Sequence, residues 1–273
     1  MISRKGLTMT AMLLTIALSS GCQTGAKKTE AMDFQAQVEW KAPDPAVSKR
    51  PKILFVGNSY TFYNNFTTMF VNIIDAQDRK SDVYELSQTY YTLKRFADPE
   101  DRTGMKLDKA LQAIKWDIVI FQEDTSMALA SAAEKEMYPY ARILDEKVKA
   151  VGGQTAFLMT WAPKNGIQNG LKKYGREEVQ AQLADSYMTI ADELDSLLIP
   201  VGVGFMRCAA EYPEIELWDT DGVHPSTAGT YLAACTTYAL VYQESPENCT
   251  YLGKLDQDVA TKLQKVAADM ILN

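Results

Sequence analysis

The chain has 273 residues, of which 47% are hydrophobic, 10% aromatic and 23% charged, and these proportions are typical of a folded globular protein. Its formal net charge of −7 argues against DNA or RNA as a partner, because nucleic-acid binding proteins carry a basic surface. The only histidine is His224, which excludes multi-histidine metal centres and confines any histidine chemistry to one position.

The N-terminus has the pattern of a bacterial export signal. Arg4 and Lys5 precede an apolar stretch from residue 9 to residue 18, which is too short for a permanent membrane anchor. The stretch ends in Ser-Gly-Cys, which resembles a lipobox. We therefore predict a signal peptide over 1–21 and lipidation of Cys22. Cleavage near Gly21 with ordinary secretion is the alternative, because Ser19 stands where a lipobox usually has leucine.

Residues 22–50 are polar without apolar periodicity, so they are predicted to be a flexible tether that follows the lipidated N-terminus and precedes one domain at 51–273. This predicts an exported lipoprotein of the cell envelope that touches the membrane only through its lipid. Three further cysteines, Cys208, Cys235 and Cys249, have no metal-site spacing. One disulfide and three buried thiols are equally compatible with the sequence.

Strands and helices alternate through the rest of the chain. The predicted strands are 52–56, 82–86, 117–121, 155–161 and 200–205, and the predicted helices are 67–77, 107–114, 132–150, 177–197, 227–242 and 255–272. This alternation predicts an α/β fold, in which a parallel sheet carries helices on both faces. In such sheets the ligand site lies beyond the carboxyl ends of the strands.

The first strand ends in Gly57-Asn58-Ser59, directly before a helix. A serine at this position exposes its hydroxyl at the edge of the sheet where ligands bind, and its backbone N–H can donate to an oxyanion. An ordinary helix N-cap serine is the alternative. The segment lacks the pattern of a phosphate-binding loop.

A second candidate is Asp221-Gly222-Val223-His224, in a loop before a late helix. An aspartate three residues before a histidine can turn back and accept a hydrogen bond from the imidazole, which is the orienting role in a nucleophile–base–acid triad. Asp219 offers a second carboxylate nearby, although the spacing favours Asp221.

Together these two blocks resemble the SGNH (GDSL-like) hydrolase superfamily, with Gly57-Asn58-Ser59 as the nucleophile block and Asp221-x-x-His224 as the last block. The strings ILFVGNSYT and DGVHPSTAGTYLAA look closest to a bacterial branch described as a domain of unknown function. The resemblance spans about 51–242. It implies a three-layer α/β/α fold of the flavodoxin-like type with a five-stranded parallel sheet. It also implies ester hydrolysis by Ser59, His224 and Asp221 without a metal or other cofactor.

Two inner blocks depart from the superfamily pattern. The glycine that usually follows strand two is absent from 87–93, so a backbone N–H of Thr89 or Tyr90 would have to join that of Ser59 in the oxyanion hole. The asparagine that usually follows strand three is replaced by Gln122, whose amide can donate in the same way. The alternative role for Gln122 is to cap its loop.

The resemblance and the export signal make an O-acetyl ester on a carbohydrate the expected substrate, with a site narrowed by Tyr90 and Tyr91. Trp161, Tyr60 and Tyr63 are candidates for stacking on sugar rings, although core packing is the alternative for each. Loop 163–175 is predicted to be a rim of the site or a plain solvent loop. A hypothesis from another class is a glycan-binding lipoprotein that has lost catalysis.

Overall fold

The computed structural model describes residues 41–43 and 49–272, so the predicted signal peptide, Cys22 and most of the predicted tether lie outside the described residues. A five-stranded sheet runs through the protein in the order β2-β1-β3-β4-β7. Its strands are β1 (Lys52–Gly57), β2 (Asp82–Ser87), β3 (Ile118–Phe121), β4 (Gln154–Leu158) and β7 (Leu197–Ile199). Every neighbouring pair is parallel, as predicted.

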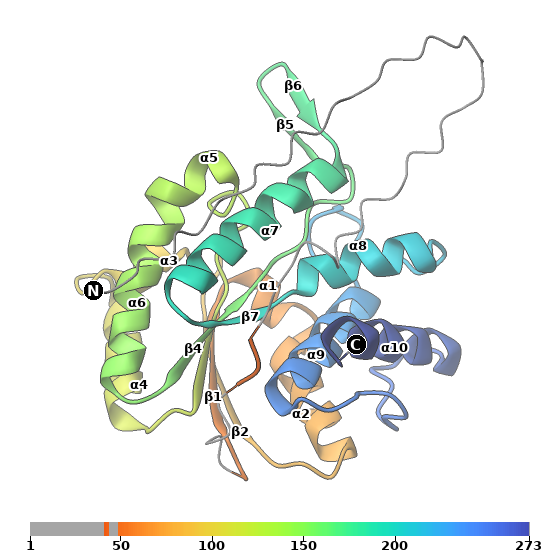
Figure 1. The fold of residues 1–273 in the computed structure, drawn as a ribbon, viewed down its shortest axis with the longest axis horizontal. Coiled ribbons are helices and arrows are strands. Elements are labelled where there is room, and N and C mark those ends of the chain that lie inside the picture. The colour runs from red at the N-terminus through yellow and green to blue at the C-terminus, as the bar shows by residue number, and fades with distance from the viewer. Residues whose placement is uncertain (1–40, 44–48, 273) are drawn as a thin grey trace, which may run out of the picture. The chain divides into compact units, whose positions relative to one another are not determined.

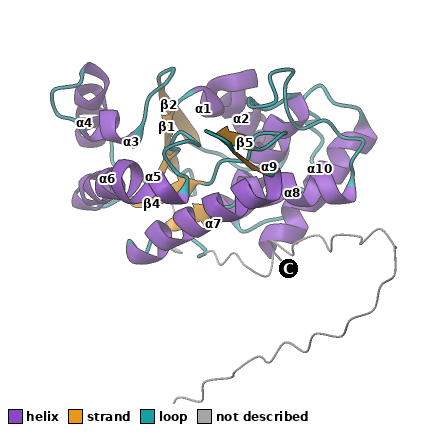
Figure 2. Cartoon of the chain, turned by 90° about the horizontal axis from the view of Figure 1, so that it is seen from above, coloured by secondary structure: helices purple, strands orange, loops and turns teal. Residues whose placement is uncertain are grey.

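Helices cover both faces of the sheet and complete the predicted three-layer α/β/α architecture (Figure 1, Figure 2). One face carries α2 (Phe66–Ala76) and α9 (Thr227–Tyr242), and α10 (Gln257–Leu272) packs on α9. The other face carries α4 (Arg102–Ala113), α6 (Tyr138–Ala150) and α7 (Arg176–Glu193). The shorter elements are α1 (Ser59–Phe62), η2 (Tyr63–Asn65), α3 (Leu93–Ala97), α5 (Ala130–Ala132) and η3 (Ala133–Met137).

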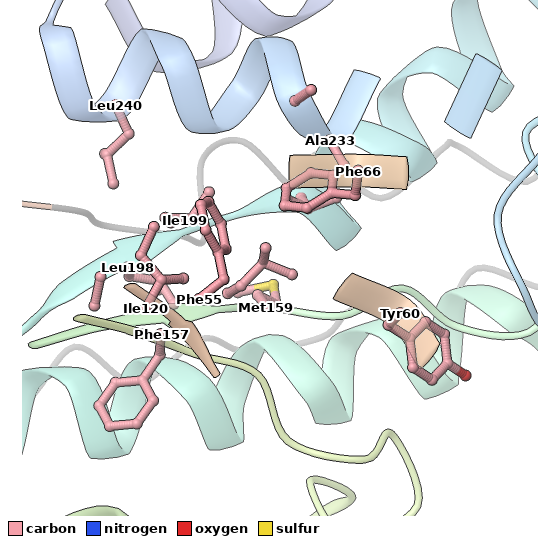
Figure 3. Packing of buried hydrophobic residues seen from close by; sticks show 14 of the residues in the cluster. Phe55, Tyr60, Phe66, Ile120, Phe157, Met159, Leu198, Ile199, Ala233 and Leu240 are labelled. Atoms are coloured by element: carbon pink, nitrogen blue, oxygen red, sulfur yellow. The ribbon is translucent and has the colours of Figure 1, made fainter. Parts of the chain in front are cut away.

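The three central strands are buried on both faces, which explains why their sequences read as continuous apolar runs. Phe55 of β1 packs edge-to-face on Phe66 of α2, with ring centroids 5.3 Å apart (Figure 3). It packs in the same way on Phe70 of α2, with centroids 5.5 Å apart. Burial of each such side chain stabilises the fold by about 1.5–3 kcal/mol. The sheet is therefore a rigid platform for the loops at its carboxyl edge.

The structure corrects the predicted fifth strand and the end of the predicted helix 177–197, because α7 ends at Glu193. The run 200–205 is not the fifth strand: β7 is 197–199, and Val201 begins helix α8 (Val201–Glu211) directly after Pro200. A helix buried on all sides has the same short apolar pattern as a buried strand, so periodicity does not separate them. Loop 163–175 contains a small antiparallel hairpin, β5 (Ile167–Asn169) and β6 (Lys172–Tyr174), which projects from the body of the protein (Figure 1).

The structure distinguishes between the two alternatives for the cysteines, one disulfide or three buried thiols. Cys208, Cys235 and Cys249 are all free and buried, so within the described residues the chain has three thiols and no disulfide. Burial raises the pKa of the Cys208 thiol to about 12. Among residues 41–43 and 49–272, no helix has the length and apolar character needed to cross a membrane.

Candidate active site

Ser59 lies where the central strand β1 meets helix α1. The preceding Asn58 adopts an extended backbone, and its side-chain oxygen accepts a hydrogen bond from the N–H of Tyr60 at 3.2 Å. Asn58, rather than Ser59, is therefore the N-cap, so the serine hydroxyl is left free for other partners. Ser59 is half-buried, at the carboxyl edge where parallel α/β sheets bind their ligands.

The structure brings Ser59, His224 and Asp221 into one hydrogen-bonded chain. The Ser59 Oγ lies 2.9 Å from Nε2 of His224, and Nδ1 of the same ring lies 2.5 Å from Oδ2 of Asp221. Both distances are within hydrogen-bonding range. The order hydroxyl, imidazole, carboxylate is the arrangement in which a base takes a proton from a nucleophile while an acid orients the base.

A tight turn holds the aspartate beside the histidine. The second oxygen of Asp221 accepts hydrogen bonds from the N–H groups of Val223 and His224, at 2.8 and 2.9 Å. Gly222 has φ +70°, a left-handed conformation that glycine adopts without steric cost. The Val223 carbonyl accepts a hydrogen bond from the Trp161 indole at 3.0 Å, so the turn is also tied to the chain beyond β4.

Asp221 is held as an anion by its partners. Partial burial disfavours its charge, but the hydrogen bond from the His224 ring and those from the backbone outweigh burial and lower the pKa of Asp221. Asp219, the alternative carboxylate, accepts instead from the Tyr63 hydroxyl at 3.0 Å and from the Thr220 N–H at 2.7 Å. The structure thus places Asp221, not Asp219, on the imidazole.

Gln122 does not occupy the expected oxyanion position. The residue is fully buried, and its Nε2 donates to the Glu123 carbonyl at 2.6 Å. Its Oε1 accepts from the Asn58 N–H at 2.9 Å. A Cβ on Gly57 would lie 2.5 Å from this oxygen, so only glycine permits the contact. The extra methylene relative to asparagine carries the amide behind the turn that holds Ser59, where it braces that turn.

Glu123 is a buried carboxyl group that the sequence predictions missed. It accepts hydrogen bonds from the N–H groups of Leu93 and Asp124, at 3.1 and 2.6 Å, and links the loops that follow β2 and β3. Burial raises the pKa of Glu123 to about 8, because the two N–H donors only partly compensate for lost hydration. The sequence signal that could have identified Glu123 is an acidic residue two positions after an apolar strand.

The turn after β2 is tied to the nucleophile segment. The Gln88 N–H donates to the Gly57 carbonyl at 3.0 Å, and the Asn58 side-chain amide donates to the Tyr91 carbonyl at 3.0 Å. Tyr90 has φ +59°, so it adopts the conformation that the superfamily's usual glycine favours. The N–H groups of Thr89 and Tyr90 have no hydrogen-bond partner within the described part of the chain.

The predicted aromatic contacts divide into three groups. Tyr91 does not narrow the site: it is buried, and its hydroxyl faces Asp101 at 3.1 Å. Trp161 and Tyr60 are 1% and 8% exposed and pack on each other, so they serve the core rather than a sugar. Tyr60 lies at the margin of the buried cluster with its hydroxyl turned away from it (Figure 3). Tyr90 alone is widely exposed.

Solved structures with the same fold are known, whereas no protein-family model and no curated protein matches the chain. A protein from Slackia heliotrinireducens assigned to the SGNH hydrolases is 28% identical, with a TM-score of 0.59 over 70% of this chain and 98% of that chain. A DUF4886 family protein from Bacteroides uniformis is 18% identical, with a TM-score of 0.70 over 82% and 95%. The esterase EstA from Pseudoalteromonas is 17% identical, with a TM-score of 0.53 over 71% and 97%.

The Bacteroides and Pseudoalteromonas proteins share the fold with this chain. The Slackia protein shares the fold and, at 28% identity, more of the sequence, over 98% of its own length. Strand order, the nucleophile block at the end of β1 and the Asp-x-x-His block before α9 agree with this relationship. The chain therefore belongs to the SGNH hydrolase superfamily of ester-hydrolysing enzymes.

Proposed function

We propose that this protein is a serine esterase that removes O-acetyl groups from carbohydrates. The observation that carries the proposal is the chain of hydrogen bonds at 2.9 and 2.5 Å from Ser59 through His224 to Asp221. Ser59 attacks the ester carbonyl while His224 accepts its proton and then returns it to the leaving alcohol. Water releases acetate from the serine in the second half of the reaction.

The tetrahedral intermediate needs hydrogen-bond donors at its oxyanion. The N–H of Ser59 and the N–H groups of Thr89 and Tyr90 are our candidates, because these turns are tied together and the latter two groups have no partner among the described residues. Backbone donors held by such a scaffold require no rearrangement when the charge develops. Gln122 contributes by holding the turn that carries Ser59, through the hydrogen bond from the Asn58 N–H, rather than by donating to the oxyanion.

The open position of the site favours a small acyl group on a large alcohol. The side chains of His224 and Asp221 are 28% and 45% exposed, so the reacting groups lie at the surface. A long acyl chain would need an apolar channel, whereas the exposed hydrophobic side chain on the turn after β2 is the single ring of Tyr90. An exposed tyrosine suits a sugar ring, whose C–H face packs on aromatic groups.

The proposal is tested with purified protein on p-nitrophenyl acetate, butyrate and octanoate, and on acetylated xylan with acetate release as the readout. We expect the acetyl esters to react fastest. Ser59→Ala should abolish turnover and labelling by a fluorophosphonate probe while leaving the fold intact. Equal rates for wild type and Ser59→Ala would reject the esterase.

The second candidate is a glycan-binding protein with little or no catalysis on the same fold. One observation favours it, namely that the amide of Gln122 is engaged in the interior, so one expected oxyanion donor is missing. Loss of one such donor typically reduces the rate about a hundred- to a thousand-fold. Glycan binding by both wild type and Ser59→Ala, without acetate release by either, would establish this alternative.

We further propose that the enzyme is an exported lipoprotein, attached to the membrane only through a lipid on Cys22. Its support is the sequence pattern of residues 1–22. Radiolabelled palmitate should label the wild type and not Cys22→Ala. Absence of label in the wild type would favour simple secretion.

A further inference from the structure

Tyr63 lies against the imidazole of His224. The two rings are nearly parallel, with centroids 4.6 Å apart and an interplanar angle of 18°. Tyr63 begins η2, directly after the helix that starts at Ser59, so the chain segment that carries the nucleophile also supplies a flat support for the base. Neither the superfamily resemblance nor the triad itself accounts for this contact.

The Tyr63 side chain is fastened at its far end to the histidine loop. Its hydroxyl donates to Asp219 Oδ2 at 3.0 Å, and the N–H of Asp219 donates to the His224 carbonyl at 2.8 Å. The hydrogen bond to Asp219 raises the pKa of Tyr63, so the hydroxyl remains a donor throughout the neutral range. This gives a use to the second carboxylate of the Asp219–Asp221 pair.

The next residue secures the other side of the same loop. The Asn64 amide donates to the Pro225 carbonyl at 2.8 Å and to the Thr230 hydroxyl at 3.0 Å. Asn64 and Asn65 have φ values of +52° and +56°, a left-handed conformation that costs free energy in any residue other than glycine. With these two consecutive left-handed residues, the Tyr63 hydroxyl bonds to Asp219 and the Asn64 amide bonds to Pro225. The two contacts hold the histidine loop before and after His224.

The stack also has an electrostatic consequence. The face of a tyrosine ring attracts a cation, so the stacked arrangement favours the imidazolium over the neutral imidazole. The imidazolium is the form of His224 that exists once the serine proton has been taken. The other groups at the ring are Ser59 on Nε2, Asp221 on Nδ1 and the more distant Tyr60 ring at 5.8 Å. The Asp219 carboxylate accepts from the Tyr63 hydroxyl and not from a ring nitrogen.

We infer that Tyr63 is a positioning residue for the base: its ring holds the His224 imidazole opposite Ser59 and stabilises it in the protonated state, and Asn64 fixes the loop from the other side. The inference rests on the proposed esterase for its catalytic meaning. Its physical content, an interaction with the protonated ring, is measurable without turnover.

The test uses the fact that the protein contains a single histidine. With a purification tag free of histidine, the Hε1 resonance of His224 is titrated by NMR in wild type, Tyr63→Phe and Tyr63→Leu, each also in the Ser59→Ala background. Tyr63→Phe keeps the stack and loses only the hydroxyl. We expect the titration midpoint to stay in Tyr63→Phe and to move about 0.5–1 pH unit lower in Tyr63→Leu.

Kinetics on an acetyl ester give the second measurement. We expect kcat to fall about five- to thirty-fold in Tyr63→Leu, with KM within about twofold, and to stay within about threefold of wild type in Tyr63→Phe. The acid limb of the pH profile should move in the same direction as the NMR midpoint. An unshifted midpoint in folded Tyr63→Leu, or equal losses in both variants, would overturn the inference.

Two glycine substitutions test the contact between Asn64 and the histidine loop, even if the Tyr63→Leu variant does not fold. Asn64→Gly and Asn65→Gly both allow the left-handed backbone, but only Asn64 bonds to the histidine loop, and Asn65 is exposed. We expect kcat to fall about three- to tenfold in Asn64→Gly alone. Equal effects would reject the role of Asn64. Absence of turnover in the wild type would reject the esterase instead, while the NMR titration would still decide on Tyr63.

Discussion

The side-chain oxygen of Gln122 accepts a hydrogen bond from the backbone N–H of Asn58, the residue before Ser59, at 2.9 Å. The nitrogen of the same amide donates to the Glu123 carbonyl at 2.6 Å. Because Gln122 is fully buried, water cannot replace either partner if the side chain is removed. The turn that carries the nucleophile is therefore supported from inside the protein.

Gln122→Ala should lower the free energy of unfolding by about 2–4 kcal/mol, because it leaves a buried N–H unpaired and creates a cavity. Urea unfolding measures this change. Gln88→Ala is the same substitution at an exposed position directly after β2, and it should change the free energy of unfolding by less than about 0.5 kcal/mol. Unchanged stability of Gln122→Ala, together with a hundred-fold loss in kcat, would instead assign Gln122 to the oxyanion hole.

Asp221→Asn should reduce kcat by about 10³–10⁴-fold, since an amide facing Nδ1 favours the tautomer that cannot accept the serine proton. Asp219→Asn should reduce it less than about tenfold, because Asp219 has no contact with the imidazole nitrogens and its amide oxygen can still accept from Tyr63. Steady-state kinetics on one acetyl ester compare the two. A larger loss in Asp219→Asn would make that residue the acid of the triad.

The rate constant kcat/KM should fall towards acidic pH, because a protonated His224 cannot take the proton of Ser59. The lowered pKa of Asp221 keeps that carboxylate charged across the same window, so a single proton, that of the imidazole, should define the acid limb. The profile is measured from pH 4.5 to 8.5 at constant ionic strength. A rate independent of pH between 5 and 8 would contradict His224 as the base.

Glu123 should make stability depend on pH. Its pKa is about 8 in the folded protein against an ordinary value of 4.5, so between these values the folded state binds a proton that the unfolded chain has released. The contribution of Glu123 to stability is therefore complete below pH 4.5 and is lost as pH rises to 8, by up to about 1.4 kcal/mol per pH unit.

Urea unfolding at pH 5.5, 6.5 and 7.5 measures this slope. Glu123→Gln cannot titrate and should flatten it, although the amide cannot satisfy both N–H donors and the variant should be less stable at pH 5.5. Glu146→Gln, at an exposed position, should keep the wild-type slope. An unchanged slope in Glu123→Gln would show that the carboxyl is already ionised in the folded protein.

Much of the fold follows from patterns within single segments. Runs such as 52–57 and 118–121 are apolar because both faces of a central strand are covered, and that pattern is local. The run 200–205 was misassigned for a related reason: α8 contacts α7, α9 and α10, so it too is apolar on most sides. Whether a short apolar segment is a strand or a helix depends on neighbours that are distant in the sequence.

The sequence by itself determined the alternation of strands and helices, the serine at the end of the first strand and the aspartate three residues before the only histidine, because each depends on spacing along the chain. Only the tertiary structure decided which side chains face the site. Ser59 and His224 are 165 positions apart and meet at 2.9 Å, Gln122 turns inward, and Tyr63 lies on the imidazole. These contacts arise from the packing of separate segments, which sets distances that no spacing along the chain encodes.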